Sequence, residues 1–188
     1  VLPNPGFELD LNQDKGPDFW NWGDWNTGSK VHWDTTTSHS GTACVRIDCV
    51  TDKQRGSYAL NPRVGPGPWV FKAWTRTDAT MQAEPHNGPV ARLIAVDDQG
   101  NQCGTTFAYG KPGSAQWQLT TVSFDLPPGA HHINLELFNL FAKGTVWWDD
   151  VSLHYDREQA EKQETERQLQ RKHVMEAQGT IDAVAKAV

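Results

Sequence analysis

Short runs of alternating apolar and polar residues, separated by turn-forming residues, occupy most of the sequence. In residues 42–50, Val45 and Ile47 fall on one face of an extended chain. Arg46 and Asp48 fall on the other face, which is the two-residue period of a half-buried strand. Similar runs, bounded by Gly, Pro, Asp and Asn, lie at residues 68–77, 90–96, 104–110, 117–126, 131–140 and 145–153. Short strands at roughly even spacing, with no helical periods between them, predict an antiparallel β-sandwich.

The pattern changes at Asp156. From there onward the sequence has no proline, one glycine and many strong helix formers. Glu158 and Lys162 form an i,i+4 pair in the favourable orientation. Apolar positions are sparse, so this helix is expected either to be a solvated linker or to pack in part against a partner. The sequence therefore predicts a β-domain at residues 1–155 and a helical linker or appendage at residues 156–188.

Composition adds one strong feature, which is tryptophan. The 188 residues are enough to bury a core, and the formal net charge of −6 gives no basic footprint for nucleic acid. No apolar run approaches the roughly 18 residues that a membrane span needs. All nine tryptophans and all 11 prolines lie at or before Trp148, so composition places the same boundary between the β-domain and the helix.

Six motifs occur in a fixed order along the β-domain. They are NPGFE (4–8), WDTTTSHSGTACVRI (33–47), GPGPWVFKAWTRTD (65–78), AVDDQGN (95–101), WQLTTVSFDLPPGAHHINLEL (117–137) and GTVWWDDVSL (144–153). This series resembles the β-jelly-roll carbohydrate-binding modules of families four, nine, sixteen and twenty-two, within the galactose-binding-like fold. The resemblance covers residues 4–153. It implies an all-β chain, an antiparallel β-sandwich jelly roll, followed here by the C-terminal α-helix.

The resemblance also implies a function. Such modules are non-catalytic, bind a polysaccharide or oligosaccharide, and target an attached glycoside hydrolase or lyase to its substrate. We therefore expect an accessory domain of a bacterial polysaccharide-degrading enzyme, with a catalytic domain in cis and no nucleic-acid or membrane partner. The expected location is secreted, periplasmic or cell-surface, with a signal peptide outside this chain.

Family members usually carry a structural calcium ion. It joins a carboxylate of the N-terminal motif to an aspartate of the last strand, with backbone carbonyls from a turn between them. In this sequence those positions are Glu8, Asp149 and the stretch from Ser38 to Ala43. Calcium takes six to eight oxygen ligands of these kinds. The alternative is that Glu8 and Asp149 are ordinary surface acids at strand ends.

The resemblance places the sugar site on the outer, concave face of one sheet. The strands expected to form that sheet lie at residues 57–64, 90–97, 104–109 and 131–140. Leu93, Ala95, Ile133, Leu135 and Leu137 set the core phase of these strands. The opposite phase is expected to face the groove and contains Arg92, Ile94, Asn134, Glu136 and Phe138. Arg92 and Glu136 can hold sugar hydroxyls by charge-assisted hydrogen bonds, or they can pair with each other as a salt bridge.

Sugar recognition also needs exposed aromatic rings, because the apolar faces of sugar rings stack on them. The segment FWNWGDWNTG (19–28) offers three tryptophans in a loop rich in Gly and Asn. Trp20 lies nearest the position where family members bury a tryptophan, so we expect it in the core. Trp22 and Trp25 are then expected as exposed plates at the end of the groove. Further aromatic candidates on the groove sheet are Tyr58, Phe107 and Tyr109.

Two other classes of function stay open. The domain can be a structural accessory that packs against a catalytic domain without binding sugar, a hypothesis favoured if Trp74 and Trp147 form an exposed apolar patch on the other sheet. An enzyme is the third class. The carboxylate pairs at 97–98 and 149–150 are accounted for by a turn and by the final-strand motif. No Ser-His-Asp order, phosphate loop or zinc spacing occurs in the sequence.

Overall fold

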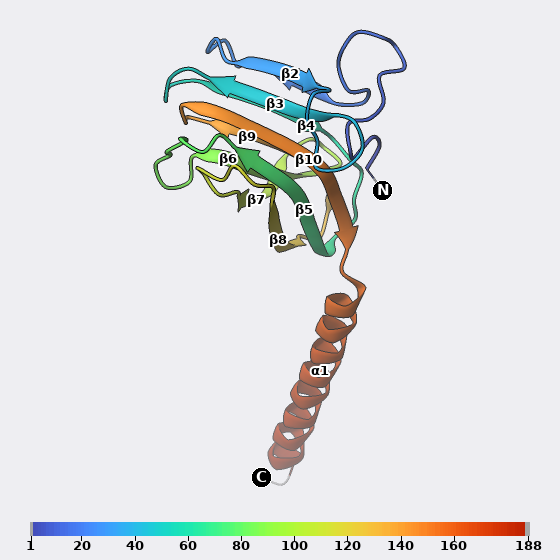
Figure 1. Ribbon diagram of the computed structural model, residues 1–188. Helices are drawn as coiled ribbons and strands as arrows, with labels where there is room; N and C mark the ends of the chain where they lie inside the picture. Colours follow the sequence, from blue (N-terminus) through green and yellow to red (C-terminus); the bar gives the residue numbers. More distant parts are fainter. Residues whose placement is uncertain (1, 187–188) are drawn as a thin grey trace. The chain divides into compact units, whose positions relative to one another are not determined.

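A computed structural model describes residues 2–186, except for the side chains at 180 and 182–186. The chain divides into two compact units, one that ends at Tyr155 and one that begins at Asp156. The first unit contains all ten strands of the described chain, and the second contains its α-helix. Both are drawn in Figure 1.

The β-domain is a sandwich of two five-stranded antiparallel sheets (Figure 1). Sheet A contains, in spatial order, β1 (Asn21–Gly23), β4 (Arg55–Leu60), β9 (Ala130–Leu140), β6 (Gly88–Asp97) and β7 (Gln102–Tyr109). Sheet B contains β2 (Lys30–Asp34), β3 (Cys44–Cys49), β10 (Gly144–Tyr155), β5 (Gly67–Thr77) and β8 (Gln118–Leu126). The predicted all-β sandwich followed by a C-terminal helix is confirmed. The four strands expected to share one sheet do so, and β1 joins them at the edge.

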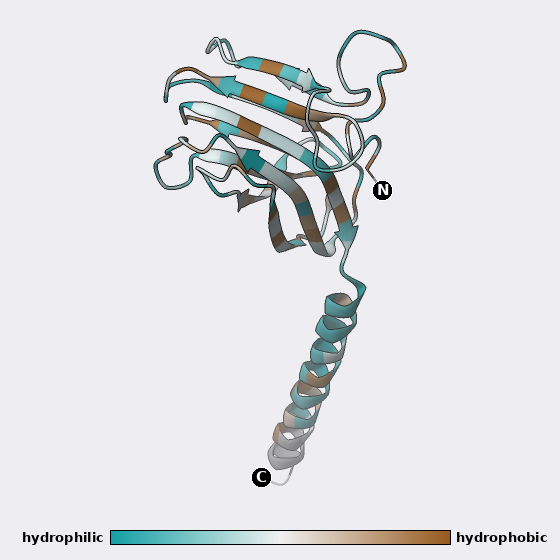
Figure 2. Cartoon of the chain, viewed as in Figure 1, coloured by the Kyte–Doolittle hydropathy of each residue, from teal (hydrophilic) through white to brown (hydrophobic). Residues whose placement is uncertain are grey.

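The core lies between the sheets and follows the period-two alternation of the strands. Figure 2 shows brown hydrophobic bands alternating with paler and teal bands along several strands. Leu93, Ile133, Leu135 and Leu137 are almost completely buried, so the predicted core phase of β6 and β9 is correct. Fully burying each such side chain stabilises the fold by roughly 1.5–3 kcal/mol. Trp148 is also fully buried, and its indole Nε1 donates to the Phe138 carbonyl at 3.2 Å.

Trp20 lies in the core, as expected. Only 5% of it is exposed, and its indole Nε1 donates to the backbone carbonyl of Asn4 at 3.0 Å. Its ring packs 4.9 Å from the centroid of Phe7, which belongs to the N-terminal motif. The first of the tryptophans in 19–28 therefore anchors this segment and fixes where β1 begins.

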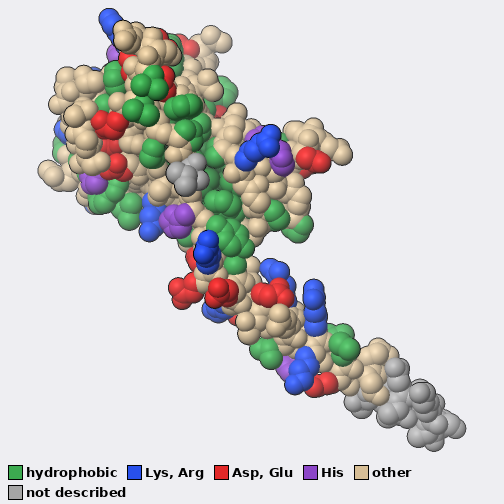
Figure 3. Space-filling model, turned by 90° about the vertical axis from the view of Figure 1, so that its right-hand side faces the viewer, with side chains coloured by type: hydrophobic (Ala, Val, Ile, Leu, Met, Phe, Trp, Pro, Cys, Tyr) green, Lys and Arg blue, Asp and Glu red, His purple; other side chains and the backbone are tan. Residues whose placement is uncertain are grey.

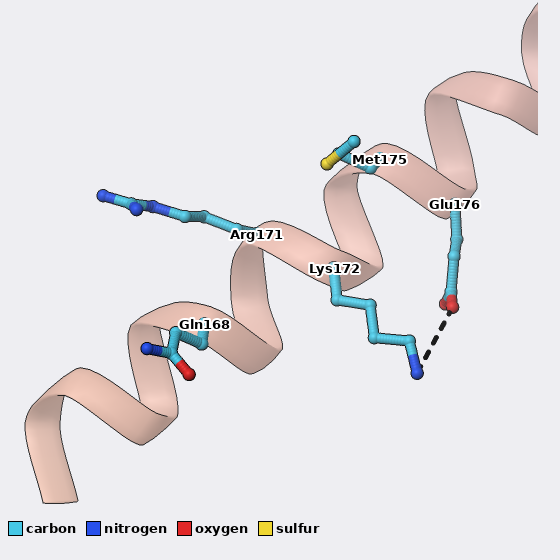
Figure 4. Close-up of a pocket in the computed structure, with 5 residues that line it drawn as sticks. All are labelled: Gln168, Arg171, Lys172, Met175 and Glu176. Carbon is cyan, nitrogen blue, oxygen red and sulfur yellow. Dashed lines mark ion pairs between the residues drawn. The ribbon is translucent and has the colours of Figure 1, made fainter.

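The second unit is helix α1 (Arg157–Lys186). Asp156 caps it, because its carboxylate accepts a hydrogen bond from the backbone N–H of Gln159 at 3.0 Å. Charged side chains of both signs are interspersed along the helix (Figure 3), and Lys172 pairs with Glu176 at 3.9 Å (Figure 4). The hollow drawn in Figure 4 is lined by side chains of this one helix only. Among the described helices there is none whose length and apolar character would let it cross a bilayer.

Candidate functional site

The outer face of sheet A contains a hollow of about 270 Å³. Its lining residues come from β1, the following turn, β4 and β9, and they are Asn21, Trp22, Gly23, Trp25, Ser57, Ala59 and Glu136. Strand register explains why a hollow forms here. Gly23 lies opposite Ser57, and Ala59 lies opposite both Asn21 and Glu136. Small side chains in adjacent strands leave a depression that larger neighbours then wall.

The turn after β1 fixes Trp25 beside this hollow. Asp24 accepts a hydrogen bond from the backbone N–H of Asn26 at 3.0 Å, and Trp25 and Asn26 have φ angles of 53° and 57°. The indole Nε1 of Trp25 donates to Ser57 Oγ at 3.0 Å, and the Arg55 guanidinium lies 4.5 Å from the Trp25 ring centroid. The ring is still 41% exposed, which confirms the predicted exposure of this tryptophan.

Trp22 borders the hollow at the edge of sheet A. It lies on β1, where it is paired with Tyr58 of β4 at the edge of sheet A. Because no strand lies beyond β1 in this sheet, 64% of Trp22 is exposed. The predicted exposure of Trp22 is therefore also confirmed, and both tryptophans contribute to the same hollow.

Glu136 closes the side of the hollow toward the middle of the sheet. Its Oε2 accepts from Arg92 Nε at 2.6 Å across the β6–β9 pair, so the two residues form the ion pair that the sequence left as one of two possibilities. The pair occupies Arg92 Nε and one carboxylate oxygen. The terminal guanidinium nitrogens and Glu136 Oε1 carry the remaining hydrogen-bonding capacity of the two groups.

Phe138 faces the groove side but is covered. The Arg92 guanidinium lies 5.2 Å from its ring centroid, and the Trp25 ring lies 6.1 Å away on the other side. Only 2% of Phe138 is exposed, so the expectation that it would be open to a ligand is wrong. Phe138 instead packs against Trp25 and Arg92 and helps to hold both side chains in place.

The prediction of Tyr58 as a groove residue is also wrong. Tyr58 points to the inner side of sheet A, is 2% exposed and packs 6.3 Å from the Phe7 ring. Burial raises the pKa of its hydroxyl above the ordinary value. Its neighbours Ser57 and Ala59 are the β4 residues that face the groove.

Asn134 and Tyr109 lie on sheet A but away from the hollow. Asn134 is half-buried on β9, opposite Ile94. Tyr109 is 47% exposed at the opposite edge of the sheet, on β7, where it packs against His86 at 5.0 Å and Phe107 at 6.1 Å. The structure therefore gathers Trp22, Trp25 and Glu136 with Arg92 beside them, and it leaves Asn134 and Tyr109 outside this group.

The small groove residues were missed by sequence analysis. Asn21, Gly23, Ser57 and Ala59 carry no distinctive chemistry, and their role follows only from the register between β1 and β4. The sequence signal that could have indicated them was a small residue next to a predicted aromatic site residue, namely Gly23 beside Trp22 and Ser57 beside Tyr58.

Glu8 and Asp149, the predicted calcium ligands, meet at one turn. Glu8 accepts from the Thr42 hydroxyl at 2.7 Å and from the backbone N–H groups of Thr42 and Ala43 at 3.0 and 3.2 Å. Asp149 Oδ2 accepts from the backbone N–H of His39 at 2.7 Å. Both acids therefore hold residues of the 38–43 turn, with Asp149 fully buried and Glu8 exposed at the surface.

Three acidic side chains lie around this turn. A Cβ atom placed on Gly6 would lie 3.4 Å from Asp150 Oδ1 and 3.9 Å from Asp149 Oδ1, and the nearest Glu8 atom would be its Cγ at 3.7 Å. Asp149 is fully buried, and this burial raises the pKa of its carboxyl to about 6. Among the described residues no three acidic, His or Cys side chains form a metal-binding group by themselves, so backbone carbonyl oxygens would complete the coordination.

On the outer face of sheet B, large side chains pack against one another. Trp147 lies between the guanidinium groups of Arg76 and Arg46, at 4.9 and 5.7 Å from the ring centroid, and its indole donates to Asp34 Oδ2 at 3.0 Å. Trp74 stacks on His39 at 3.9 Å. Both tryptophans are half-buried, so they do not form the exposed apolar patch that would have favoured the structural-accessory hypothesis.

No family model matches the sequence, and no curated protein matches it. Solved structures do match. The CBM22-1 xylan-binding domain of Xyn10C from Paenibacillus barcinonensis matches with a TM-score of 0.54 and 12% identity, over 79% of this chain and 90% of that one. The fold is that of the jelly-roll carbohydrate-binding modules. This confirms the resemblance predicted from the six motifs, and at this identity the likeness concerns the fold alone.

Proteins of other kinds share the jelly-roll fold. The Stig cyclase Fisc from Fischerella sp. TAU matches with a TM-score of 0.55 and 16% identity, over 81% of this chain and 94% of that one. The enzymatically active domain of tailspike protein 4 from bacteriophage CBA120 matches with a TM-score of 0.60 and 13% identity over 81% of this chain. The chain spans about a fifth, 21%, of that tailspike domain. Function therefore has to be argued from the groove.

Proposed function

We propose that the β-domain is a non-catalytic module that binds a polysaccharide or oligosaccharide along the outer face of sheet A. Trp22 and Trp25 stack against the apolar faces of sugar rings, because aromatic rings present flat apolar surfaces. Glu136 and Arg92 hold sugar hydroxyls through charge-assisted hydrogen bonds.

The hollow between the two tryptophans carries this proposal. Its volume of about 270 Å³ lies at the lower end of small-molecule sites, which suits one or two units of a longer chain. An aromatic wall on one side and a partly paired carboxylate on the other match the amphipathic surface of a sugar ring. The fold shared with known carbohydrate-binding modules supports the same conclusion but does not carry it alone.

Affinity electrophoresis against soluble polysaccharides, followed by a glycan array, tests the proposal on the full 188-residue chain. Trp22→Ala is expected to weaken binding about 30-fold, or ~2 kcal/mol, as for a central aromatic anchor. Trp117→Ala is the matched control, because Trp117 packs near His39 on the side of sheet B. Binding to no glycan would contradict the proposal and favour a structural accessory domain instead.

The proposal that the chain is non-catalytic has its own test. Enzymes such as the cyclase share this fold, so the fold does not decide the question. The polysaccharide that binds most tightly is incubated with the purified chain, and new reducing ends are measured. We expect none above a blank, and turnover that disappears in Trp22→Ala would overturn this part of the proposal.

We also propose that the module targets an attached polysaccharide-degrading domain to its substrate, outside the cytoplasm of a bacterium. The terminal helix α1 provides a solvated connector for such an arrangement. Deleting the β-domain from the natural protein should lower activity on an insoluble polysaccharide while leaving activity on short soluble fragments unchanged. Equal loss on both substrates would contradict targeting.

A structural calcium ion between Glu8 and Asp149 is a further part of the proposal. Calcium bound there neutralises a buried carboxylate and ties the N-terminal motif to β10. The observation behind it is that Asp149 Oδ1, Asp150 Oδ1 and the Glu8 side chain all lie near Gly6.

Chelation tests the calcium site. At about 100 times the dissociation constant, a bound ion stabilises the fold by ~2.7 kcal/mol, so EGTA should lower the melting temperature by about 5–10 °C. Asp149→Asn should remove this response, whereas Asp97→Asn, in an exposed turn, should keep it. An unchanged melting temperature of the wild type in EGTA would contradict a structural calcium ion.

A further inference from the structure

A second, larger cavity lies at the open edge of the sandwich, where the edge strands β1 and β2 of the two sheets come near each other. Its volume is about 510 Å³, within the range of small-molecule sites. The side chains that matter for its chemistry are Asp14, Lys15, Trp22, His32, Trp33 and Tyr58. The groove hollow and this edge cavity share one residue, which is Trp22.

The loop before β1 forms one wall of the edge cavity and is held by its own hydrogen bonds. Asp10 accepts from the backbone N–H groups of Asp14 and Lys15 at 3.1 and 3.2 Å. Asp18 accepts from the backbone N–H of Leu11 at 2.7 Å. The wall that carries Asp14 and Lys15 is therefore a defined surface.

Tyr58 also lines the cavity, and its hydroxyl is an unusual group. Tyr58 is 98% enclosed by the domain, with 2% exposed, and among the described residues its hydroxyl has no hydrogen-bond partner. Buried polar groups almost always have a partner. Among the described residues, the unpaired polar atoms that are completely sealed from solvent are Arg55 Nε, Arg76 Nε and Asn139 Oδ1. The Tyr58 hydroxyl is not one of them, so it is not completely sealed from solvent. An occupant of the cavity is therefore the natural partner for this hydroxyl.

The other side chains of the cavity fit a ring with several hydroxyl groups. Trp22 and Trp33 supply flat apolar surface, and the Trp33 indole is fixed by donating to the Phe7 carbonyl at 2.7 Å. His32 Nε2 pairs with Asp48 at 3.3 Å, which leaves its Nδ1. The Lys15 ammonium has three donors and no partner among the described residues. Aromatic surface combined with donors and acceptors is the chemistry of a sugar unit.

We propose that the edge cavity is a second saccharide subsite, which takes a sugar unit beyond those held in the groove of the same glycan. Trp22 is the wall between the two subsites. The Tyr58 hydroxyl hydrogen-bonds the unit that enters the cavity. This inference rests on the proposed function, because the glycan first has to bind to sheet A.

Indole NMR separates the two subsites. The full chain, labelled with ¹⁵N-tryptophan, is titrated with xylohexaose, cellohexaose and β-1,4-galactotriose. Trp25 lines only the groove and Trp33 lines only the edge cavity, so their indole signals report one subsite each. We expect the probe that shifts Trp25 most strongly to shift Trp33 with the same dissociation constant.

Tyr58→Phe is the decisive variant. It removes a hydroxyl without a partner, so the fold should keep its stability in urea. Affinity should fall about three- to tenfold, the loss of one hydrogen bond, and the Trp33 shift should disappear while the Trp25 shift stays. Tyr109→Phe is the matched control at the far edge of sheet A and should change neither. Lys15→Gln should weaken binding without altering the Trp25 shift.

The outcomes distinguish this inference from the proposed function. A Trp25 shift without a Trp33 shift, with wild-type affinity in Tyr58→Phe, overturns the edge subsite and leaves the groove standing. A Trp33 shift without a Trp25 shift overturns the groove, and with it the inference that one glycan spans both subsites. If no probe shifts either signal, both proposals fail.

Discussion

The outer faces of the two sheets carry similar residues in different arrangements. On sheet B, Trp147 is enclosed by Arg46 and Arg76, which are its direct neighbours on β3 and β5. On sheet A, Trp25 also has an arginine against its ring, but it borders a hollow. Both faces are rich in tryptophan and arginine, and the hollow lies on sheet A.

The difference comes from the residues that lie opposite the aromatic groups. Large side chains occupy adjacent strands on sheet B, so they pack against one another and fill the surface. Gly23, Ser57 and Ala59 occupy the equivalent positions on sheet A, and they leave space beside Trp22 and Trp25. Tryptophan content alone therefore does not predict a hollow surface, whereas small residues in register beside tryptophan mark the hollow on sheet A.

The largest expected effect is on stability and falls on sheet B. Trp147→Ala removes a half-buried ring from between two arginines and leaves Asp34, which is 8% exposed, without its indole donor. Large-to-small changes of this kind cost several kcal/mol, so the free energy of unfolding should fall by about 3 kcal/mol. Urea denaturation measures this change, and glycan affinity of the folded variant should be unchanged.

Trp25→Ala is the corresponding variant on sheet A, and the opposite balance of effects is expected from it. It should weaken glycan binding about 30-fold and lower the free energy of unfolding by only about 1 kcal/mol, since the ring is partly exposed and makes one side-chain hydrogen bond. If Trp147→Ala were to weaken binding as strongly as Trp25→Ala, the distinction between a structural face and a binding face would be lost.

The sequence was informative where the pattern is local. Alternation predicted the inward phase of β6 and β9, including Leu93 and Ile133, because each strand reports its own period. The tryptophans at 22 and 25 were predicted as exposed because they lie in a loop rich in Gly and Asn. The proximity of Glu8 and Asp149 came from the family resemblance, since nothing local links residues so far apart in the chain.

The rest depended on register between distant strands. Tyr58 was predicted as a plate because it is aromatic, but β4 places Tyr58 and Leu60 inward and Ser57 and Ala59 outward. A shift of one residue in the expected register moves every side chain of a strand to the opposite face. An aromatic residue in a short strand is therefore easily assigned to the wrong face. The short strands β1 and β2 were not predicted, and without them neither the hollow nor the edge cavity can be drawn.

Filling the hollow is the next test, with a smaller effect. Ala59 lies on its floor, opposite Asn21 and Glu136. Ala59→Leu places a branched side chain where a sugar ring is expected, so binding should weaken about tenfold, or ~1.4 kcal/mol. Isothermal titration measures this change. Ala59→Ser, which keeps the hollow open, should bind as the wild type does, and equal affinity of Ala59→Leu would show that the ligand does not use the hollow.

The smallest expected effect is the response of sheet B to acid. Burial alone would raise the pKa of Asp34, but hydrogen bonds from Thr36 and Trp147 and the charge of Arg46 outweigh it, and the pKa is lowered. An acid with a lowered folded-state pKa stabilises the fold above its unfolded value and loses that contribution as pH falls through the folded pKa. Around neutral pH, Asp34→Asn should therefore be less stable than the wild type by about 1 kcal/mol, the net contribution of one ordinary hydrogen bond.

This stability difference should shrink as the pH is lowered below about 4, because the wild-type carboxyl then becomes neutral like the amide. Urea denaturation across the pH series measures it, and Asp98→Asn, an exposed acid in the turn after β6, is the control. A stability gap that stays constant into acid would mean that the Asp34 carboxylate does not act through its charge. The geometry of Trp147 would then depend on packing between the two arginines alone.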